Sequence, residues 1–396
     1  SAQSCLYISY VGRSIKDNNE KIPSVLVSEL LDYVEQSYVL EADQHLAHSD
    51  SSKKLRAHLI QQHPMVPFSA DYFSPHSPLF SYASAWLSAA GTESKVAQPF
   101  YTDGLVAEAQ EQIELDALIR FLKNPCRSFF NQRLKVFFAT HEIDAQDEEP
   151  FALDGLQGYL IKQRYLETAL SGGDLDQLDK TILAEGALPV AITGQLMLAK
   201  IRRDCSELAQ KLVPLCEGEP QRLEVNIAFP NLVLQGWLDH CYPAHLLRYR
   251  PAEVNARDRL SSWVEHLALC LSSDQCRNTV YRGLSGKVHY RAVEKEQAYG
   301  YLKTLVEFYQ QGMNAPQAFD ASCAREYLKQ SQKDPDKAEQ LIETLFYGNA
   351  YKAGLQDDPY LRRAYPDYAQ FSAQFIPLAD AIYAPMLDYI EEGKDD

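Results

Sequence analysis

The sequence LVLQGWLDHCYPAHLLRYR, residues 232–250, decides the fold class of this chain. Its apolar residues fall in short runs that predict two strands, 232–238 and 246–249, and the preceding run 223–228 predicts a third. Helical periodicity stands on both sides of these strands. We therefore predict a mixed α/β (α+β) core in which many helices pack on a small sheet.

The segments that follow extend this pattern toward the C-terminus. Helical periodicity predicts helices over 256–271 and 294–310, and a possible hairpin spans 279–292 around Ser285-Gly286. From Asp320 onward the sequence predicts acidic helices. No internal repeat interrupts this order.

The N-terminal part is organised differently. The run 5–11 predicts a strand and 23–34 a helix with proline at its start. Because that strand opens the sequence with nothing before it, we expect the chain to belong to a longer polypeptide. Sustained helical patterning resumes only after a polar stretch, so we place a domain boundary between residues 1–105 and 106–396.

Composition excludes several classes of protein. The chain has 396 residues, 46% of them hydrophobic, and a formal net charge of −16, which argues against a general polyanion binder. Its eight cysteines form no Cys-x-x-Cys pair, so neither a zinc ribbon nor a disulfide framework is predicted, and a reducing, cytoplasmic location is expected. No apolar run is long enough for a membrane span. The sequence contains no glycine-rich phosphate loop, so no nucleotide cofactor is predicted.

Asp239 ends a Gly-x-hydrophobic-Asp pattern, residues 236–239, on the first strand of the deciding stretch. One large class of nucleases holds a divalent metal with this pattern and an acid-x-Lys pair on the next strand. Residues two apart on a strand project from one face, so Arg248 and Arg250 occupy those two positions here. A guanidinium supplies no oxygen ligand and repels a cation, so we predict a degenerate site that holds no metal.

Three interpretations of this strand pair stay open. Arg248 and Arg250 suit a phosphate group, because a guanidinium binds its oxygens in a bidentate manner. Alternatively, Asp239 forms a structural ion pair with one of the two arginines. The third interpretation is an active metal-dependent nuclease that uses Asp239.

Basic residues are concentrated in two segments of this acidic chain. Residues 246–291 carry eight basic residues against four acids, and residues 117–140 carry five and no acid. Tyr249, Tyr281 and Tyr290 stand among the charges of the first segment, which suits single-stranded nucleic acid, although tyrosines half buried in a sheet are at least as common. The second segment is equally well explained as a solvated helix face. The candidate nucleic-acid contacts are Arg248, Arg250, Arg257, Arg259, Arg282, Lys287 and Arg291 in the first segment, and Arg127, Arg133 and Lys135 in the second.

The second basic segment also predicts a buried helix face. Asn124-Pro125 has the pattern of a helix start, with a capping side chain before a proline in the first turn. The apolar residues that follow fall on one stripe, which we expect to face the core. They are Cys126, Phe129, Phe130, Leu134 and Phe137.

Several stretches resemble the C-terminal part of the RecC family, the gamma subunits of bacterial exodeoxyribonuclease V. The likeness covers nearly the whole chain. It is carried by LYISYVGRS (6–14), HPMVPFS (63–69), RLKVFF (133–138), DEEPFALDGL (147–156), GWL (236–238) and WVEHLAL (263–269).

The resemblance implies that residues 1–105 complete an inactive helicase-like domain. It implies that residues 106–396 form a nuclease-like domain of the PD-(D/E)XK type that is also inactive. Gln297 and Tyr301 then resemble the Gln-x-x-x-Tyr element that follows the active strands in active relatives, retained here as a relic.

The resemblance also implies partners and a role. The family joins the beta (RecB) and alpha (RecD) subunits, splits duplex DNA, channels the single strands and takes part in Chi recognition during repair of double-strand breaks. A chain in this role is no enzyme by itself. The hairpin 279–292 is then a candidate contact for DNA or a partner subunit. The alternative is a scaffold that touches no DNA.

Overall fold

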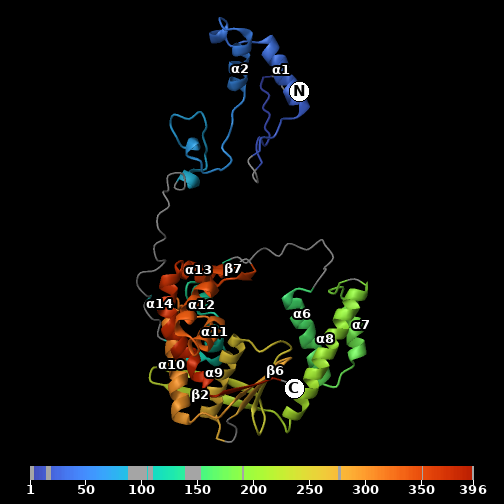
Figure 1. Cartoon of the computed structure of the whole chain (residues 1–396), viewed down its shortest axis with the longest axis vertical. Coiled ribbons are helices and arrows are strands. Elements are labelled where there is room, and N and C mark those ends of the chain that lie inside the picture. The colour runs from blue at the N-terminus through green and yellow to red at the C-terminus, as the bar shows by residue number, and fades with distance from the viewer. Residues whose placement is uncertain are drawn as a thin grey trace. The chain divides into compact units, whose positions relative to one another are not determined.

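The structure is a computed structural model that describes residues 4–14, 19–87, 105, 110–138, 153–189, 191–274, 278–349 and 351–394. The chain divides into two compact units, Ser1–Gln98 and Pro99–Asp396 (Figure 1). Their assignment to helicase-like and nuclease-like domains stays a prediction.

The first unit is built from two helices and short turns. It contains α1 (Val25–Ser37), α2 (His48–Leu59) and the 3-10 turns η1 (Glu41–Asp43), η2 (Ala70–Tyr72) and η3 (Ser84–Trp86). The helix predicted over 23–34 is confirmed as α1. The strand predicted over 5–11 is wrong, because in the described part of this unit the only β-type pairing is the bridge between Arg13 and Glu20. An extended run without a neighbouring strand leaves its apolar side chains exposed, as Tyr7 and Val11 are.

The second unit is built around a mixed sheet, as predicted. The predicted strands and hairpin are confirmed as β2 (Gln221–Phe229), β3 (Leu232–Cys241), β4 (Leu246–Tyr249), β5 (Thr279–Arg282) and β6 (Gly286–Tyr290). Two short strands that the sequence did not predict, β1 (Gln112–Glu114) and β9 (Ile390–Lys394), also join the sheet.

The order of the strands is β1-β3-β4-β5-β6-β9, with β2 also paired to β3. β2 and β3 form an antiparallel hairpin, and β3 meets β4 antiparallel through Cys241 and Leu246. β4 and β5 are parallel, so the chain crosses over between them through α9 (Ala256–Ser272). α9 begins with a capping box in which Asn255 and Asp258 satisfy each other's backbone N–H groups.

β9 lies at the edge of the sheet, where acidic helix was predicted. Its sequence, IEEGK, contains one apolar residue, so no alternation marked it as a strand. It forms by pairing with β6, with Ile390 opposite Tyr290 and Glu392 opposite Val288. Charged residues are frequent on edge strands, because only one side of such a strand is paired.

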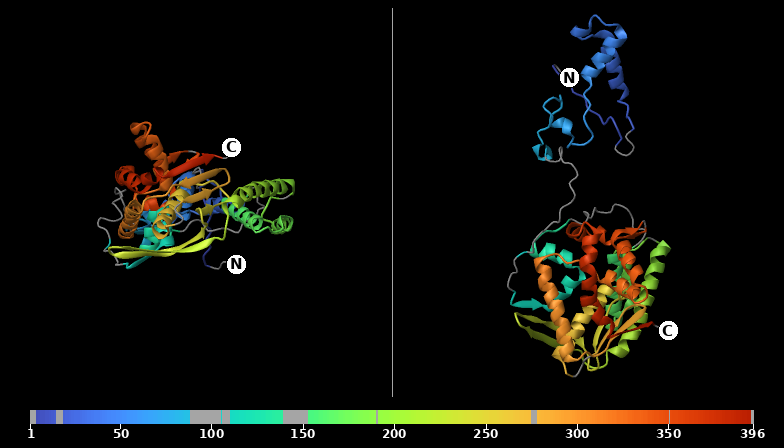
Figure 2. Two further views of the ribbon diagram at one scale, coloured as in Figure 1. Left: turned by 90° about the horizontal axis from the view of Figure 1, so that it is seen from below. Right: turned by 60° about the vertical axis from the view of Figure 1, so that its left-hand side comes forward.

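Helices cover this sheet in two groups (Figures 1 and 2). One group consists of α6 (Gly155–Leu170), α7 (Leu175–Ala184) and α8 (Ala191–Leu212), which pack beside one another. The other contains α4 (Leu115–Lys123), α5 (Pro125–Ser128), α10 (Lys295–Asn314), α11 (Ala321–Ser331), α12 (Pro335–Tyr347), α13 (Pro359–Ala364), α14 (Tyr368–Leu378) and α15 (Ala384–Leu387). The described residues contain no helix that is both long and apolar enough to span a bilayer.

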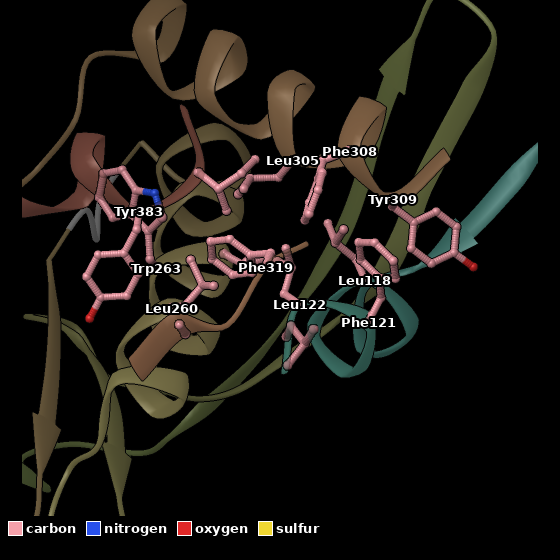
Figure 3. Close-up of a cluster of buried hydrophobic side chains, with 14 of the residues drawn as sticks. Leu118, Phe121, Leu122, Leu260, Trp263, Leu305, Phe308, Tyr309, Phe319 and Tyr383 are labelled. Carbon is pink, nitrogen blue, oxygen red and sulfur yellow. The ribbon is translucent and has the colours of Figure 1, made fainter. Parts of the chain in front are cut away.

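The core of the second unit is centred on α9 and α10 (Figure 3). Trp263 of α9 is 1% exposed and lies next to the ring of Tyr290 from β6. On the side toward α4, the ring of Phe121 lies 5.3 Å from that of Phe308. Aromatic packing therefore joins the sheet, α9, α10 and α4 in one cluster.

The predicted apolar stripe after Asn124 is confirmed at Cys126, Phe129 and Phe130, which are buried, but is wrong at Phe137, which is 70% exposed. The helical turns end at Arg133, and Lys135 then adopts a left-handed backbone with φ of 57°. Because the chain leaves the helix at this point, helical spacing no longer decides which of the following side chains face the core. Phe138 therefore packs in place of Phe137, with its ring 4.9 Å from that of Tyr360.

Two glycines of α10 provide a test of this packing. A Cβ atom added at Gly312 would lie 2.2 Å from Cζ of Phe121, whereas one added at Gly300 would meet nothing within 4 Å. We expect Gly312→Ala to lower the free energy of unfolding by roughly 1–3 kcal/mol through overpacking. Gly300→Ala should raise it by up to about 1 kcal/mol, because alanine favours helix. Denaturant titration of both variants measures the difference, and equal effects would contradict the close packing of α10 on α4.

Candidate functional site

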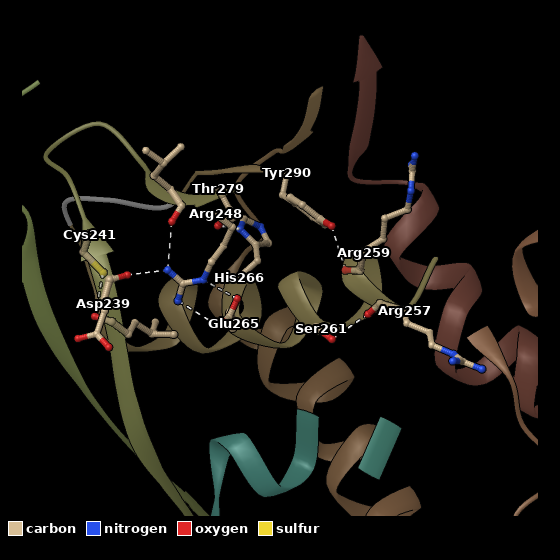
Figure 4. Close-up of polar contacts among 12 residues, drawn as sticks. Asp239, Cys241, Arg248, Arg257, Arg259, Ser261, Glu265, His266, Thr279 and Tyr290 are labelled. Atoms are coloured by element: carbon tan, nitrogen blue, oxygen red, sulfur yellow. Dashed lines mark hydrogen bonds and ion pairs between the residues drawn. The ribbon is translucent and has the colours of Figure 1, made fainter. Parts of the chain in front are cut away.

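Asp239 lies near the end of β3, but its carboxylate does not face Arg248 of β4 or Arg250, which follows that strand. The carboxylate lies 3.1 Å from Nε of Arg222 on β2, and both side chains are exposed. His240 adopts a left-handed backbone with φ of 59°, which interrupts the alternation of side chains at the end of β3. The predicted ion pair between Asp239 and Arg248 or Arg250 is therefore wrong, and Figure 4 shows the carboxylate pointing away from Arg248.

The guanidinium of Arg248 is surrounded by oxygen atoms (Figure 4). Nε and Nη2 donate to the two carboxylate oxygens of Glu265 on α9, at 2.8 and 2.9 Å. Nη1 donates to the carbonyl oxygens of Asp239, at 2.6 Å, and of Leu247, at 3.1 Å. One cation thus joins β3, β4 and α9.

This ion pair is largely withdrawn from solvent. The side chains of Arg248 and Glu265 are each 18% exposed. Burial disfavours the charged form of Arg248, but the Glu265 carboxylate outweighs it and holds the pKa of Arg248 above its usual range. The arginine is therefore permanently charged at this position.

Arg250 directly follows β4 and, like Arg248, contacts α9, so the two side chains project in the same direction as predicted. It forms an ion pair with Asp258 of α9, and its guanidinium lies 5.5 Å from the ring centre of Tyr159 on α6. Among the described residues, no three His, Cys, Asp or Glu side chains gather in a group that could hold a metal ion. At this point of the fold, the structure places guanidinium groups and the carboxylates that neutralise them.

Most other basic candidates of residues 246–291 also contact oxygen atoms of this chain. The pairs are Arg257 with Asp320 at 2.8 Å, Arg259 with Glu392, and Arg291 with Glu391 at 3.4 Å. Arg291 also donates to the carbonyl of Asp388 at 2.6 Å. Arg282 is buried on β5, opposite Lys287 of β6. Within the described residues Lys287 has no carboxylate partner, and Arg277 lies outside them.

The basic residues of the second segment are more accessible. Arg127 and Lys135 are exposed, and neither pairs with a carboxylate in the part of the chain that the structure describes. The Arg127 guanidinium lies 5.7 Å from the ring centre of Tyr360. Arg133 is half-buried at the end of the same helical turns. At Arg127 and Lys135, this face therefore offers cations that no described carboxylate neutralises.

The three tyrosines of the first segment belong to the sheet. Tyr290 is fully buried and donates to the carbonyl of Arg259 at 2.9 Å. Tyr249 and Tyr281 are half-buried, and burial raises the pKa of both phenols. A buried ring cannot stack on a base, so the structural interpretation is confirmed for Tyr290.

Gln297 and Tyr301 of α10 both contact Tyr389. The Tyr389 hydroxyl donates to Oε1 of Gln297 at 3.1 Å, and the rings of Tyr301 and Tyr389 are 6.2 Å apart. In the described part of the chain, neither residue forms a hydrogen bond with Asp239.

Sequence reasoning missed the carboxylates that complete the site. Glu265 and Asp258 lie on α9, and the sequence placed them only among the acids of a basic segment. The Asn255-x-x-Asp258 pattern could have marked the start of α9, but the contacts of Asp258 and Glu265 with β4 depend on how the helix packs.

Comparisons with known proteins agree on one family. The model of the RecC C-terminal domain matches residues 110–332. The RecBCD enzyme subunit RecC of Escherichia coli (strain K12) is 34% identical over 374 residues, which cover 92% of this chain and 33% of that protein.

More distant relatives carry the same name. The RecBCD enzyme subunit RecC of Haemophilus influenzae is 27% identical over 393 residues and that of Mycobacterium tuberculosis (strain H37Rv) 23% over 395 residues, each covering 94% of this chain. The chain spans about a third of the length of these relatives. With a family model that matches more than half of its residues and a relative 34% identical over most of its length, the chain belongs to the RecC family.

Proposed function

We propose that this chain is a noncatalytic, DNA-handling part of a RecC subunit within a RecBCD enzyme, acting in recombinational repair of double-strand breaks. The observation that carries the proposal is the Arg248 guanidinium, which stands at the strand position of the acid in the nuclease pattern and is held by the Glu265 carboxylate and the Asp239 carbonyl. Its relatives are named as subunits of the RecBCD enzyme.

A nuclease-like origin of the second unit is supported by the order of its elements. α8 is followed by the antiparallel strands β2, β3 and β4, then by α9 and by β5 parallel to β4. The Gly-x-hydrophobic-Asp pattern stands on β3, Arg248 stands on β4, and Arg250 directly follows β4, which is the order of the two strand segments in the PD-(D/E)XK interpretation. The helicase-like assignment of the first unit rests on the family resemblance alone.

DNA contact is best supported at the second basic segment. Arg127 and Lys135 are exposed and lack carboxylate partners among the described residues, unlike Arg248, Arg250 and Arg257. Strand separation, strand channelling, Chi recognition, and assembly with RecB and RecD subunits are the roles proposed for the whole protein. A scaffold without DNA contact is the alternative.

We expect the chain to leave linear single- and double-stranded DNA intact in magnesium or manganese, and Asp239→Ala to behave identically. Gel analysis of both proteins measures this. Metal-dependent cleavage that Asp239→Ala abolishes would establish an active nuclease.

The ion pair of Arg248 with Glu265 can be tested by removing one charge or both. Arg248→Met leaves the Glu265 carboxylate largely buried without its partner, which should cost roughly 3 kcal/mol of stability. The double variant Arg248→Met/Glu265→Leu removes both charges and should recover most of that loss. Denaturant titrations of the two single variants and the double variant measure the coupling; additive effects would rule out a cooperative pair.

Replacing Arg127 and Lys135 by glutamine should weaken binding to single-stranded DNA and reduce the slope of log K against log salt by about 1.4, because each phosphate that is no longer neutralised lowers the slope by about 0.7. Lys200→Gln/Lys329→Gln makes the same charge change at exposed positions on α8 and α11 and serves as the control. If none of the three proteins binds DNA, the scaffold interpretation holds. If all three bind equally, the chain contacts DNA at residues other than Arg127 and Lys135.

A further inference from the structure

A groove of about 350 Å³ opens beside α10, away from the ion pairs of Arg248. Tyr301 of α10 lines it, together with the last turn of α11 and the segment that follows α14. Its walls combine apolar side chains, among them Leu328 and Leu387, with the carboxylates of Asp380 and Asp388. Tyr301 is one half of the predicted Gln-x-x-x-Tyr relic, so part of this element lines the groove.

The two carboxylates are not used by the chain itself. Asp380 and Asp388 are exposed, and neither carboxylate has an ion-pair partner among the described residues. Arg291, a nearby cation, contacts the backbone carbonyl of Asp388 and the carboxylate of Glu391 instead. Among the described residues, no ion pair therefore neutralises either carboxylate.

Helix ends add to this negative field. α11 ends at Ser331 and α15 at Leu387, and both residues line the groove. The carbonyl groups at a helix C-terminus carry a partial negative charge that favours cations. The side-chain carboxamide of Gln332 at the same rim supplies a further oxygen acceptor.

We propose that this groove binds a lysine- or arginine-bearing segment of a partner protein. Both side chains combine an apolar stem with a cationic head. The stem matches the surfaces of Leu328 and Leu387, and the head matches the carboxylates of Asp380 and Asp388, which can each accept a charge-assisted hydrogen bond. This interaction is independent of the proposed DNA contact, which would require the opposite charge.

A labelled nine-residue Gly/Ser peptide with two arginines tests the proposal on the full chain, with a peptide carrying glutamine in place of both arginines as the reference. We expect the arginine peptide to bind and the glutamine peptide not to bind in fluorescence anisotropy. Asp380→Asn/Asp388→Asn should weaken binding at least tenfold. Ala384→Trp, which fills the groove without changing its charge, should weaken it to a similar degree.

The control is Glu339→Gln/Glu343→Gln, which removes two acidic charges from α12, outside the groove. It should change the affinity less than twofold. Because the chain carries a net charge of −16, nonspecific attraction of a basic peptide would weaken equally in both double variants, and that result would overturn the proposal. Unchanged binding by Ala384→Trp, with circular dichroism showing a folded protein, would overturn it as well.

Discussion

One half-buried cation organises the centre of the second unit. The Arg248 guanidinium contacts Glu265 of α9 and the backbone carbonyls of Asp239 and Leu247, so it fixes α9 against β3 and β4. A metal ion placed among carboxylate and carbonyl oxygens would make comparable electrostatic contacts. A guanidinium keeps the charge but offers no open coordination position for water, so it can support the fold without providing metal chemistry.

The same principle extends along α9. Arg257 forms an ion pair with Asp320, and Arg259 forms one with Glu392. Both carboxylates come from distant parts of the chain. Pairs of this kind specify which element lies against which, because a misplaced helix would leave one charge buried without its partner. The excess of acidic residues lies elsewhere on the surface, including the rim of the groove beside α10.

The sequence predicted the local structure of the second unit better than its contacts. The strands β2 to β6 and the helices α9 and α10 follow apolar periodicity, which is a local property. β1 and β9 have too few residues or too few apolar ones to show such a pattern, and they exist only because β3 and β6 offer free edges. At the site, the common face of Arg248 and Arg250 followed from strand geometry, whereas the partner of Asp239 depended on the backbone turn at His240.

The pairing of β1 with β3 and of β6 with β9 governs how this unit can fold. Gln112 pairs with Val233, and Tyr290 with Ile390, so each contact closes a long loop of chain. Closing a long loop lowers the conformational entropy of the chain before the strand contacts can stabilise it, and this slows folding. During synthesis the hairpin of β2 and β3 can form early, but the sheet edge at β6 stays unpaired until residues 390–394 have emerged from the ribosome. Until then, the newly made chain presents an open strand edge that a chaperone could protect.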